Sequence, residues 1–291
     1  MVVTVRFSSR VACTFLLLFN CQAYLVPKNL QCQRQPKVVS NTPRNSLCLS
    51  AKEGTVTTGG PTNFWVNAWD DIQNGGNKRW IVDDVSLKQK ALGHITRNFS
   101  KKDNRLTSLS IFCPLAGDDT FLYHAWDQGH SVVGIDLVPA AVSAMRKQFG
   151  PDDTDWTRHD SDGSMVVWKH NSGRVTLINA DAFTMMNELV GSFDAVYDKD
   201  SFGAIPQDLR SNYCKLIAAY LKTDGVIYCE AVTKSDSCSH RHEGPPYHIG
   251  QDELMDPQNY GEQFNYVEIL GVVYDIQDEE MDQVGHILKR K

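Results

Sequence analysis

The stretch from Cys113 to Asp136, CPLAGDDTFLYHAWDQGHSVVGID, contains the residue types of a nucleotide-binding loop. Its first turn holds one glycine, Gly117, where the backbone can come close to a ligand. Asp136 follows at a distance of about 20 residues, which suits a carboxylate that binds the two hydroxyls of a ribose. A dinucleotide site would instead show the fuller pattern G-x-G-x-x-G. The stretch therefore indicates a nucleoside ligand without settling which one.

The charges in this turn distinguish between cofactors. A dinucleotide places its pyrophosphate on a helix N-terminus, and the carboxylates of Asp118 and Asp119 would oppose that group. S-adenosylmethionine has no phosphate, and its sulfonium and ammonium groups are cations, so one glycine with several carboxylates suits it better. On this pattern alone, two alternatives stay open. One is a nicotinamide cofactor, and the other is no cofactor, with acids that only cap a helix and end a strand.

These residues need a sheet that brings distant loops together. Helices are expected at 64–72, 86–99 (capped by Ser86), 119–128, 138–149, 183–189, 206–221 and near Gln251. Strands are expected at LSIFC, SVVGID, the hairpin MVVWKHNSGRVTLINA, FDAVYD, GVIYCEAV, FNYVEILGVVYDI and VGHILKR. The polar segment 150–164 reads as a surface insertion. This alternation predicts one α/β domain over 63–291, with a mostly parallel sheet that binds its ligand at the strands' carboxyl ends.

Three longer spans carry a more specific pattern, in this order and separation: CPLAGDDTFLYHAWDQGHSVVGIDL, FDAVYDKDSFGAIPQDLRSNYCKLI and EGPPYHIGQDEL. With the paired tryptophans of FWVNAWDDI, they resemble the thiopurine S-methyltransferase family and its relatives, the plant-type thiol and halide methyltransferases. That family shows a PLCG-type loop, a QGH turn, a strand ending in Asp, and GPPF or GPPY. The resemblance runs from residue 63 to the C-terminus and is poor only in the Asp-rich insertion.

The resemblance implies a fold, a cofactor and a set of contacts. The fold is the Rossmann-like class I methyltransferase fold, a seven-stranded sheet of six parallel strands and one antiparallel strand with helices on both faces. The cofactor is S-adenosyl-L-methionine. Its contacts carry over to Trp65, Trp69, Leu115, Gly117, Asp136, Asp181 and Ala182. Trp80 is added as a counterpart of the family's aromatic residue just past the paired tryptophans, although its spacing differs. The alternative for Trp80 is an ordinary core or surface residue.

Methyl transfer from a sulfonium is an in-line displacement, so the enzyme must align nucleophile and methyl and exclude water. A thiolate, selenolate or halide is already a good nucleophile, and we expect no catalytic triad. Lys199 stands where thiopurine-type members often carry Arg, and it is the candidate catalytic and substrate-binding cation because positive charge favours a thiolate. The alternative is a solvated Lys199 paired with Asp198 or Asp200. Asp200 stands where the family usually has a small residue, which argues against a thiopurine-sized anionic acceptor.

Pro245, Pro246 and Tyr247 of the GPPY turn are expected to bind substrate as a rigid rim over the pocket. N-P-P-Y motifs of enzymes that methylate nucleic-acid amino groups follow the fourth strand, whereas this turn follows the fifth. The expected function is therefore methyl transfer to a small soft nucleophile, first of all a thiol. The alternatives are a halide or thiocyanate acceptor and a non-catalytic S-adenosylmethionine-binding protein. Sulfide, selenol and arsenic acceptors also fit the pattern.

Composition limits the partners. After the first 52 residues the chain carries 22 basic and 35 acidic residues, a net charge of −13. So acidic a body is a poor partner for nucleic acid or anionic lipid, and a monomer acting on a small molecule is expected. The body holds four cysteines and no C-x-x-C pair. The C-x-H-x-H spacing at 238–242 lacks a second half, so we expect neither a disulfide framework nor a metal site.

The first 52 residues differ from the rest, with seven Lys or Arg and no Asp or Glu. A short apolar run before Tyr24 gives residues 1–23 the layout of a signal peptide. Residues 24–52 are basic and rich in Ser, Asn and Gln, like a transit peptide. The expectation is a disordered targeting leader for an organelle, with a plastid as the candidate and secretion as the alternative.

Overall fold

The computed structural model describes residues 61–76, 84–99, 108–150, 152–160 and 165–291. These residues belong to one compact unit, Ser46–Lys291. The expected leader, 1–52, lies outside the described residues. No helix in the described ranges is long and apolar enough to cross a membrane.

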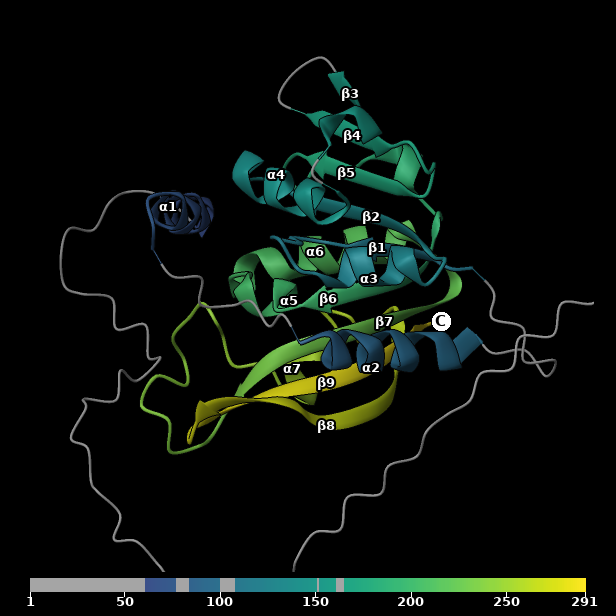
Figure 1. The fold of residues 1–291 in the computed structure, drawn as a ribbon. Coiled ribbons are helices and arrows are strands. Elements are labelled where there is room, and N and C mark those ends of the chain that lie inside the picture. The colour runs from purple at the N-terminus through teal and green to yellow at the C-terminus, as the bar shows by residue number, and fades with distance from the viewer. Residues whose placement is uncertain (1–60, 77–83, 100–107, 151, 161–164) are drawn as a thin grey trace, which may run out of the picture. The chain divides into compact units, whose positions relative to one another are not determined.

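One sheet organises the chain, with strand order β3-β4-β5-β2-β1-β6-β7-β9-β8 (Figure 1). The strands are β1 (Ser110–Cys113), β2 (Ser131–Asp136), β3 (Trp156–Asp160), β4 (Val166–His170), β5 (Val175–Asn179), β6 (Phe193–Lys199), β7 (Leu221–Lys234), β8 (Phe264–Asp278) and β9 (Met281–Arg290). Pairing is parallel among β5, β2, β1, β6 and β7, and β9 runs antiparallel to both β7 and β8. Because β9 is antiparallel to both of its neighbours, β8 runs in the same direction as β7. These seven strands therefore form the expected sheet of six parallel strands and one antiparallel strand, β9.

Two strands extend this sheet beyond the expected seven. The hairpin of β4 and β5 was predicted from its turn residues, and it is present as an antiparallel pair. The segment 150–164 was expected to be an irregular insertion, but it contains β3, which pairs antiparallel with β4. Only Trp156 of β3 is buried, and the other four side chains are exposed. This edge strand is held by backbone pairing, so its sequence lacks the alternation of hydrophobic and polar residues from which a strand is predicted.

The helices are α1 (Pro61–Gln73), α2 (Val85–Thr96), α3 (Phe121–Asp127), α4 (Pro139–Gln148), α5 (Ser201–Ala204), α6 (Gln207–Tyr220) and α7 (Gln251–Leu254). The helix expected at 183–189 is wrong, since only a short 3-10 turn, Asn187–Leu189, forms there. The cap expected from Ser86 is also wrong. The Asp84 carboxylate accepts from the Ser86 N–H and caps α2, as short acidic side chains commonly do.

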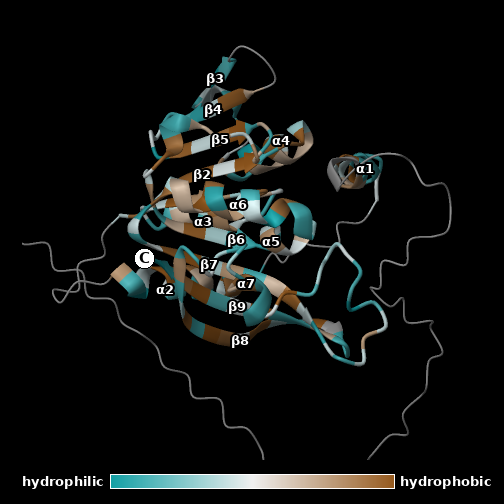
Figure 2. Ribbon diagram, turned by 180° about the vertical axis from the view of Figure 1, so that it is seen from behind, coloured by the Kyte–Doolittle hydropathy of each residue, from teal (hydrophilic) through white to brown (hydrophobic). Residues whose placement is uncertain are grey.

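The core lies on both faces of the sheet because successive strand residues point to opposite sides. In β1, Ile111 and Cys113 pack against α2, α3 and α4, while Phe112 packs with residues of α6 and α7. Accordingly, α2 and α3 lie in front of the sheet in Figure 1, and α6 and α7 lie in front of it in Figure 2. The hydrophobic colouring of the central strands in Figure 2 matches this double burial. Such a sheet fixes the loops at its carboxyl edge.

Candidate functional site

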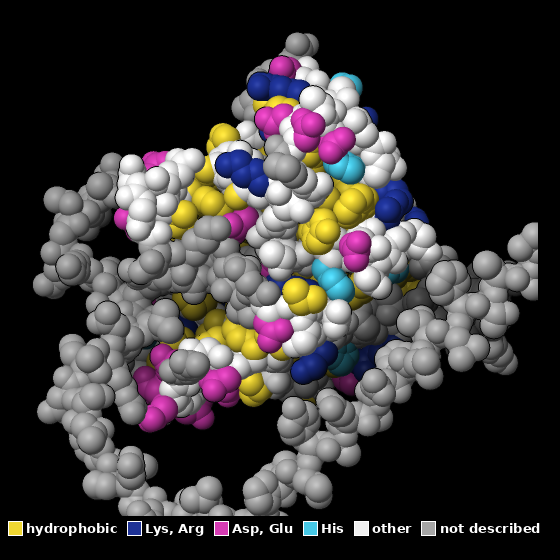
Figure 3. All heavy atoms as spheres, viewed as in Figure 1, with side chains coloured by type: hydrophobic (Ala, Val, Ile, Leu, Met, Phe, Trp, Pro, Cys, Tyr) yellow, Lys and Arg dark blue, Asp and Glu magenta, His cyan; other side chains and the backbone are white. Residues whose placement is uncertain are grey.

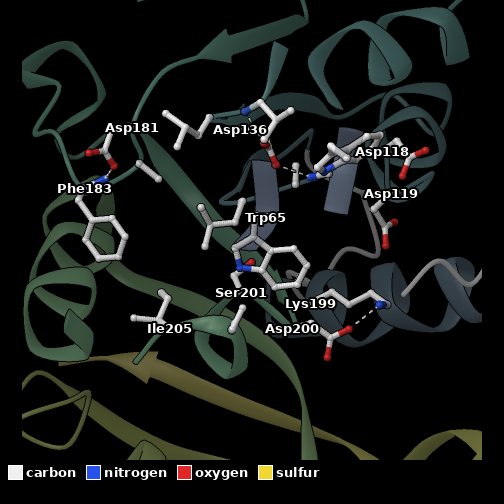
Figure 4. A pocket seen from close by; sticks show the side chains of 18 of the residues that line it. Trp65, Asp118, Asp119, Asp136, Asp181, Phe183, Lys199, Asp200, Ser201 and Ile205 are labelled. Atoms are coloured by element: carbon white, nitrogen blue, oxygen red, sulfur yellow. Dashed lines mark hydrogen bonds and ion pairs between the residues drawn. The ribbon is translucent and has the colours of Figure 1, made fainter. Parts of the chain in front are cut away.

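A pocket opens at the carboxyl ends of β1, β2, β5 and β6, where the strand order reverses (Figure 4). Eight of the residues predicted from the sequence line it: Trp65, Trp69, Leu115, Gly117, Asp136, Asp181, Ala182 and Lys199. They come from five separate segments of the chain. The convergence follows from parallel strands, whose carboxyl ends meet at one edge of the sheet. Their individual roles stay predictions.

The loop after β1 approaches the pocket with an unusual backbone. Leu115 and Gly117 have φ values of 43° and 57°, in the left-handed region. Gly117 adopts this conformation without cost, whereas Leu115 is strained, as residues at binding sites often are. The Gly117 N–H donates to Oδ2 of Asp136 at 2.9 Å. The first two predicted loops are thus joined directly.

Asp136 is buried at the end of β2, with both carboxylate oxygens engaged. Oδ1 accepts from the Val138 N–H at 2.8 Å, and Oδ2 accepts from Gly117. Burial raises the pKa of Asp136 to about 6, although the hydrogen bonds from Val138 and Gly117 oppose this rise. At neutral pH the group is therefore mostly ionised. A carboxylate has about four lone-pair positions, so it can still accept from ribose hydroxyls.

The third loop follows β5. Oδ1 of Asp181 accepts from the Phe183 N–H at 2.9 Å, and the Asp181 carbonyl accepts from the Thr184 N–H at 3.0 Å. These local bonds hold a turn where a helix was expected, because an Asp side chain competes for backbone donors. The turn leaves the Asp181 side chain exposed at the pocket.

The two tryptophans of α1 divide their tasks. Trp69 is buried against Val138 and Ala141, so it attaches α1 to α4. Trp65 is only partly buried and lines the pocket. In the view of Figure 4, its ring lies between Asp136 and the Lys199–Asp200 pair. Trp80 lies outside the described residues, and its cofactor contact stays a prediction.

One end of the pocket is formed by residues between the end of β6 and the start of α6, and we call it the acceptor end. Its residues are Lys199, Asp200, Ser201, Ile205, Pro206 and Leu209. Sequence reasoning named only Lys199 as a pocket residue here. Ser201 donates to the Pro114 carbonyl at 2.7 Å, which ties this end to the loop after β1. Apart from the charged pair of Lys199 and Asp200, the surface is mainly hydrophobic.

Lys199 is paired with Asp200, as the alternative interpretation of this residue expected, but it is not solvated, since its side chain is only 6% exposed. Its Nζ donates to Oδ2 of Asp200 at 2.7 Å. Burial would lower the pKa of Lys199, but the charge of Asp200 and smaller contributions from Tyr274 and two further acids leave this pKa raised. The ammonium is therefore permanently charged, and its charge is matched by a neighbouring carboxylate.

Lys88 is a charged neighbour that sequence reasoning missed. Its buried Nζ donates to Oδ2 of Asp119 at 2.6 Å and to the Tyr197 hydroxyl at 3.3 Å. Oδ1 of Asp119 accepts from the Phe121 N–H at 2.7 Å at the start of α3. Asp119 thus has the capping role that the sequence left open. The burial of Lys88 could have been predicted from the sequence, because Lys88 lies on the same helical face as Ala91 and Ile95.

The structure does not bring the GPPY turn into the lining of this pocket. The Tyr247 N–H donates to the Gly203 carbonyl at 2.9 Å, and its ring lies 5.3 Å from the buried Arg210 guanidinium. Pro245 and Pro246 precede it in the same turn. The turn is thus packed against α5 and α6. Substrate binding by Pro245, Pro246 and Tyr247 stays a prediction.

The charges of the pocket fit the cofactor expected from the sequence. Within the described residues, the lining holds five carboxylates and one ammonium, that of Lys199; the carboxylates are those of Asp118, Asp119, Asp136, Asp181 and Asp200. An acidic lining opposes a pyrophosphate and attracts the sulfonium and ammonium of S-adenosylmethionine. Gly117, Asp136 and Asp181 would hold its nucleoside.

Two solved structures that share this fold are methyltransferases with S-adenosylhomocysteine or S-adenosylmethionine bound. The 1,6-didemethyltoxoflavin-N1-methyltransferase of Burkholderia thailandensis, with bound S-adenosylhomocysteine, superposes with a TM-score of 0.56 at 15% identity, over 82% of this chain and 93% of its own. The magnesium protoporphyrin IX methyltransferase of Synechocystis, with bound S-adenosylmethionine, gives a TM-score of 0.53 at 11% identity, over 82% of this chain and all of its own. These similarities establish the class I methyltransferase fold.

Sequence comparison points to one family. The chain is 25% identical to thiopurine S-methyltransferase of Pseudomonas putida over 61% of this chain and 78% of that protein. It is likewise 25% identical to the enzyme of Rattus norvegicus, over 64% of this chain and 74% of that protein. The family model of thiopurine S-methyltransferase matches residues 72–285. The chain therefore belongs to the thiopurine S-methyltransferase family and is an S-adenosylmethionine-dependent methyltransferase.

Proposed function

We propose that this methyltransferase acts on a small thiol. When bound, S-adenosylmethionine supplies an electrophilic methyl group on a sulfonium. The acceptor's sulfur bonds to the methyl carbon as the carbon–sulfonium bond breaks. The electron pair stays with the departing sulfur, S-adenosylhomocysteine forms, and the thiol proton passes to water.

The observation that carries this proposal is the chemistry of the lining. Within the described residues it contains no His, Cys or Tyr. Amines and alcohols that are protonated at neutral pH commonly need a general base. Four of the five carboxylates in the lining are already engaged, Asp119 and Asp200 by lysines and Asp136 and Asp181 by backbone N–H groups. A thiol has a pKa of about 8.5 and ionises far enough to react without one. The relatives named as thiopurine S-methyltransferases support the same acceptor atom.

The chain's residues would supply binding, alignment and exclusion of water. Asp136 and Asp181 hold the nucleoside, while Trp65 covers the pocket. Ile205, Pro206 and Leu209 give the acceptor end a hydrophobic wall that suits a soft sulfur and displaces water. Alignment and desolvation are the main sources of rate in such a displacement.

The test is a product screen with the purified protein, labelled S-adenosylmethionine, a panel of small thiols, and iodide and thiocyanate. Volatile methylated products are measured by headspace mass spectrometry. Methyl thioethers as the main products would support the proposal. Methyl iodide or methyl thiocyanate as the main product would replace it with halide or thiocyanate methylation. Cofactor binding without any of these products would overturn the thiol acceptor and direct the search to sulfide, selenol and arsenic species.

A further inference from the structure

The Lys199–Asp200 ion pair presents its two ends unequally to the pocket. The Lys199 side chain is 6% exposed, whereas the Asp200 side chain is 29% exposed. The acceptor end therefore offers mainly a carboxylate, with the ammonium behind it. Figure 4 shows the Asp200 carboxylate joined to the Lys199 ammonium at this end of the pocket.

Asp200 is fixed from several directions. Its backbone is left-handed, with φ 61°, and its N–H donates to the Glu230 carbonyl at 2.8 Å. Oδ1 accepts from Nε2 of Gln283 at 2.7 Å, and Oδ2 accepts from Lys199. A left-handed non-glycine residue costs free energy and persists where the surroundings hold it. This carboxylate is thus held in one position, with lone pairs remaining for a ligand.

The hairpin of β8 and β9 supplies the support and a further negative charge. Gln283 belongs to β9, and its partner across the hairpin is Tyr274 of β8, whose ring centroid lies 5.7 Å from Nζ of Lys199. The hairpin ends beside Lys234, at the carboxyl end of β7. Between residues 275 and 282 it carries five acids and no Lys or Arg. Figure 3 shows acidic side chains gathered at this end of the molecule. Fields of one sign raise the local concentration of oppositely charged ligands.

We infer that Asp200 sets the charge of the acceptor, and that the site favours a thiol with a nearby ammonium group over a thiol with a carboxylate. This inference rests on the proposed thiol acceptor. Asp200 masks Lys199, so a carboxylate on the acceptor finds no free cation and meets a fixed negative charge. An ammonium on the acceptor would bond to Asp200, and its own positive charge would favour ionisation of the adjacent thiol. Asp200 is therefore a specificity-determining residue.

The test uses three thiols of the same size that differ in terminal charge. They are cysteamine (positive), 2-mercaptoethanol (neutral) and mercaptoacetate (negative). Initial rates of methyl thioether formation are measured for the full-length protein at saturating S-adenosylmethionine. We expect kcat/KM to fall in that order, with cysteamine exceeding mercaptoacetate by about tenfold or more, the scale of one charged hydrogen bond.

Two variants assign the preference to Asp200. Asp200→Asn keeps a side chain that tolerates positive φ, and Asp200→Gly removes the side chain at a φ that glycine adopts freely. Both remove the carboxylate that neutralises Lys199, so the order should flatten or invert in favour of mercaptoacetate. Asp127→Asn makes the same charge change at an exposed site on α3, outside the pocket lining, and should keep the wild-type order.

The outcomes distinguish the charge preference assigned to Asp200 from the proposed thiol acceptor. The expected order in the wild type, lost in both Asp200 variants and kept in Asp127→Asn, supports the inference. Thiol methylation with no preference, or with mercaptoacetate preferred, overturns it and leaves the proposed function intact. A cysteamine preference that survives both Asp200 variants also overturns it. If no thiol is methylated while S-adenosylhomocysteine still binds, the proposed function fails, and this inference fails with it.

Discussion

At the scale of single residues, Asp136 joins the loops after β1 and β2, because its oxygens accept from the Gly117 and Val138 N–H groups. Cofactor binding by the same carboxylate is a prediction that can be tested directly. We expect Asp136→Ala to weaken S-adenosylhomocysteine binding by about 1.5–3 kcal/mol, the scale of a hydrogen bond to a charged group. Isothermal titration calorimetry measures this change, with Asp127→Ala as a surface control. An unchanged dissociation constant would remove Asp136 from the cofactor site.

The buried position of Asp136 also predicts how binding depends on pH. Burial raises its pKa to about 6. Ribose hydroxyls donate hydrogen bonds to the ionised form, so affinity should be highest above that pH and fall as the group is protonated. Because only about a tenth of the group is ionised one pH unit below its pKa, the affinity for S-adenosylhomocysteine should drop about tenfold between pH 7 and pH 5. Calorimetry across this range checks it, and Asp136→Asn should flatten the profile.

Lys199 gives a prediction about the acceptor. Its ammonium neutralises Asp200, so Lys199→Met leaves the acceptor end with an added net negative charge. A negative charge beside an ionising thiol raises the thiol's pKa. We therefore expect the pH–rate profile for 2-mercaptoethanol to move to higher pH, with S-adenosylhomocysteine affinity little changed. An unmoved profile would show that the Lys199–Asp200 pair has no electrostatic effect on the reacting sulfur.

Several of these residues could be found from sequence, and others could not. Gly117, Asp136 and Asp181 each follow a recognisable strand, so the topology of parallel strands brings them together. The setting of Asp200 depends on Gln283, which is 83 positions away and reaches it only through the order of β7, β9 and β8. No local pattern encodes such a contact. Sequence reasoning therefore identified residues that line the pocket and missed what fixes the acceptor end.

At the scale of elements, a buried contact ties β6 to α6. Asp198 is fully buried at the end of β6, where it accepts from the Tyr213 hydroxyl at 2.8 Å and the Phe202 N–H at 3.0 Å. Burial raises its pKa from 3.8 to about 6. The folded state thus binds a proton more tightly than the unfolded chain. The resulting stability is fully present below pH 3.8 and is lost as pH rises through about 6.

Removing the Tyr213 hydroxyl should therefore lower the free energy of unfolding most at pH values at which Asp198 is ionised. We expect Tyr213→Phe to lower the free energy of unfolding by about 1.5–3 kcal/mol at pH 8 and by about 0.5–1.5 kcal/mol at pH 5, the scales of charged and neutral hydrogen bonds. Urea unfolding at both pH values measures the difference. Tyr220→Phe is the matched control. Among the described residues its hydroxyl bonds to backbone groups, those of Met186 and Thr184, so the loss of free energy of unfolding should not vary with pH. Equal costs for Tyr213→Phe at both pH values would contradict the assignment.

Helices and strands were predicted correctly where burial of one face gives the sequence a hydrophobic period. Prediction failed where local polar hydrogen bonds determine the structure. The helices α4 and α6 have apolar faces packed on the sheet, and both were predicted within one or two residues. In contrast, β3 is exposed on nearly every side chain, and the turn at Asp181 is held by side-chain bonds to the backbone. Neither feature produces a hydrophobic period.

At the scale of the whole molecule, the family match spans residues 72–285, and the described lining of the pocket runs from Trp65 to Leu209. The first 52 residues are acid-free and basic, as targeting segments are. We therefore expect a chain that begins at Lys52 to keep the melting temperature and the S-adenosylhomocysteine affinity of the full-length protein. A chain that begins at Asp84 lacks α1 with Trp65 and Trp69, and it should bind the cofactor more weakly. Differential scanning calorimetry and titration calorimetry on the three proteins test this. A lower melting temperature for the chain beginning at Lys52 would show that the leader stabilises the folded domain.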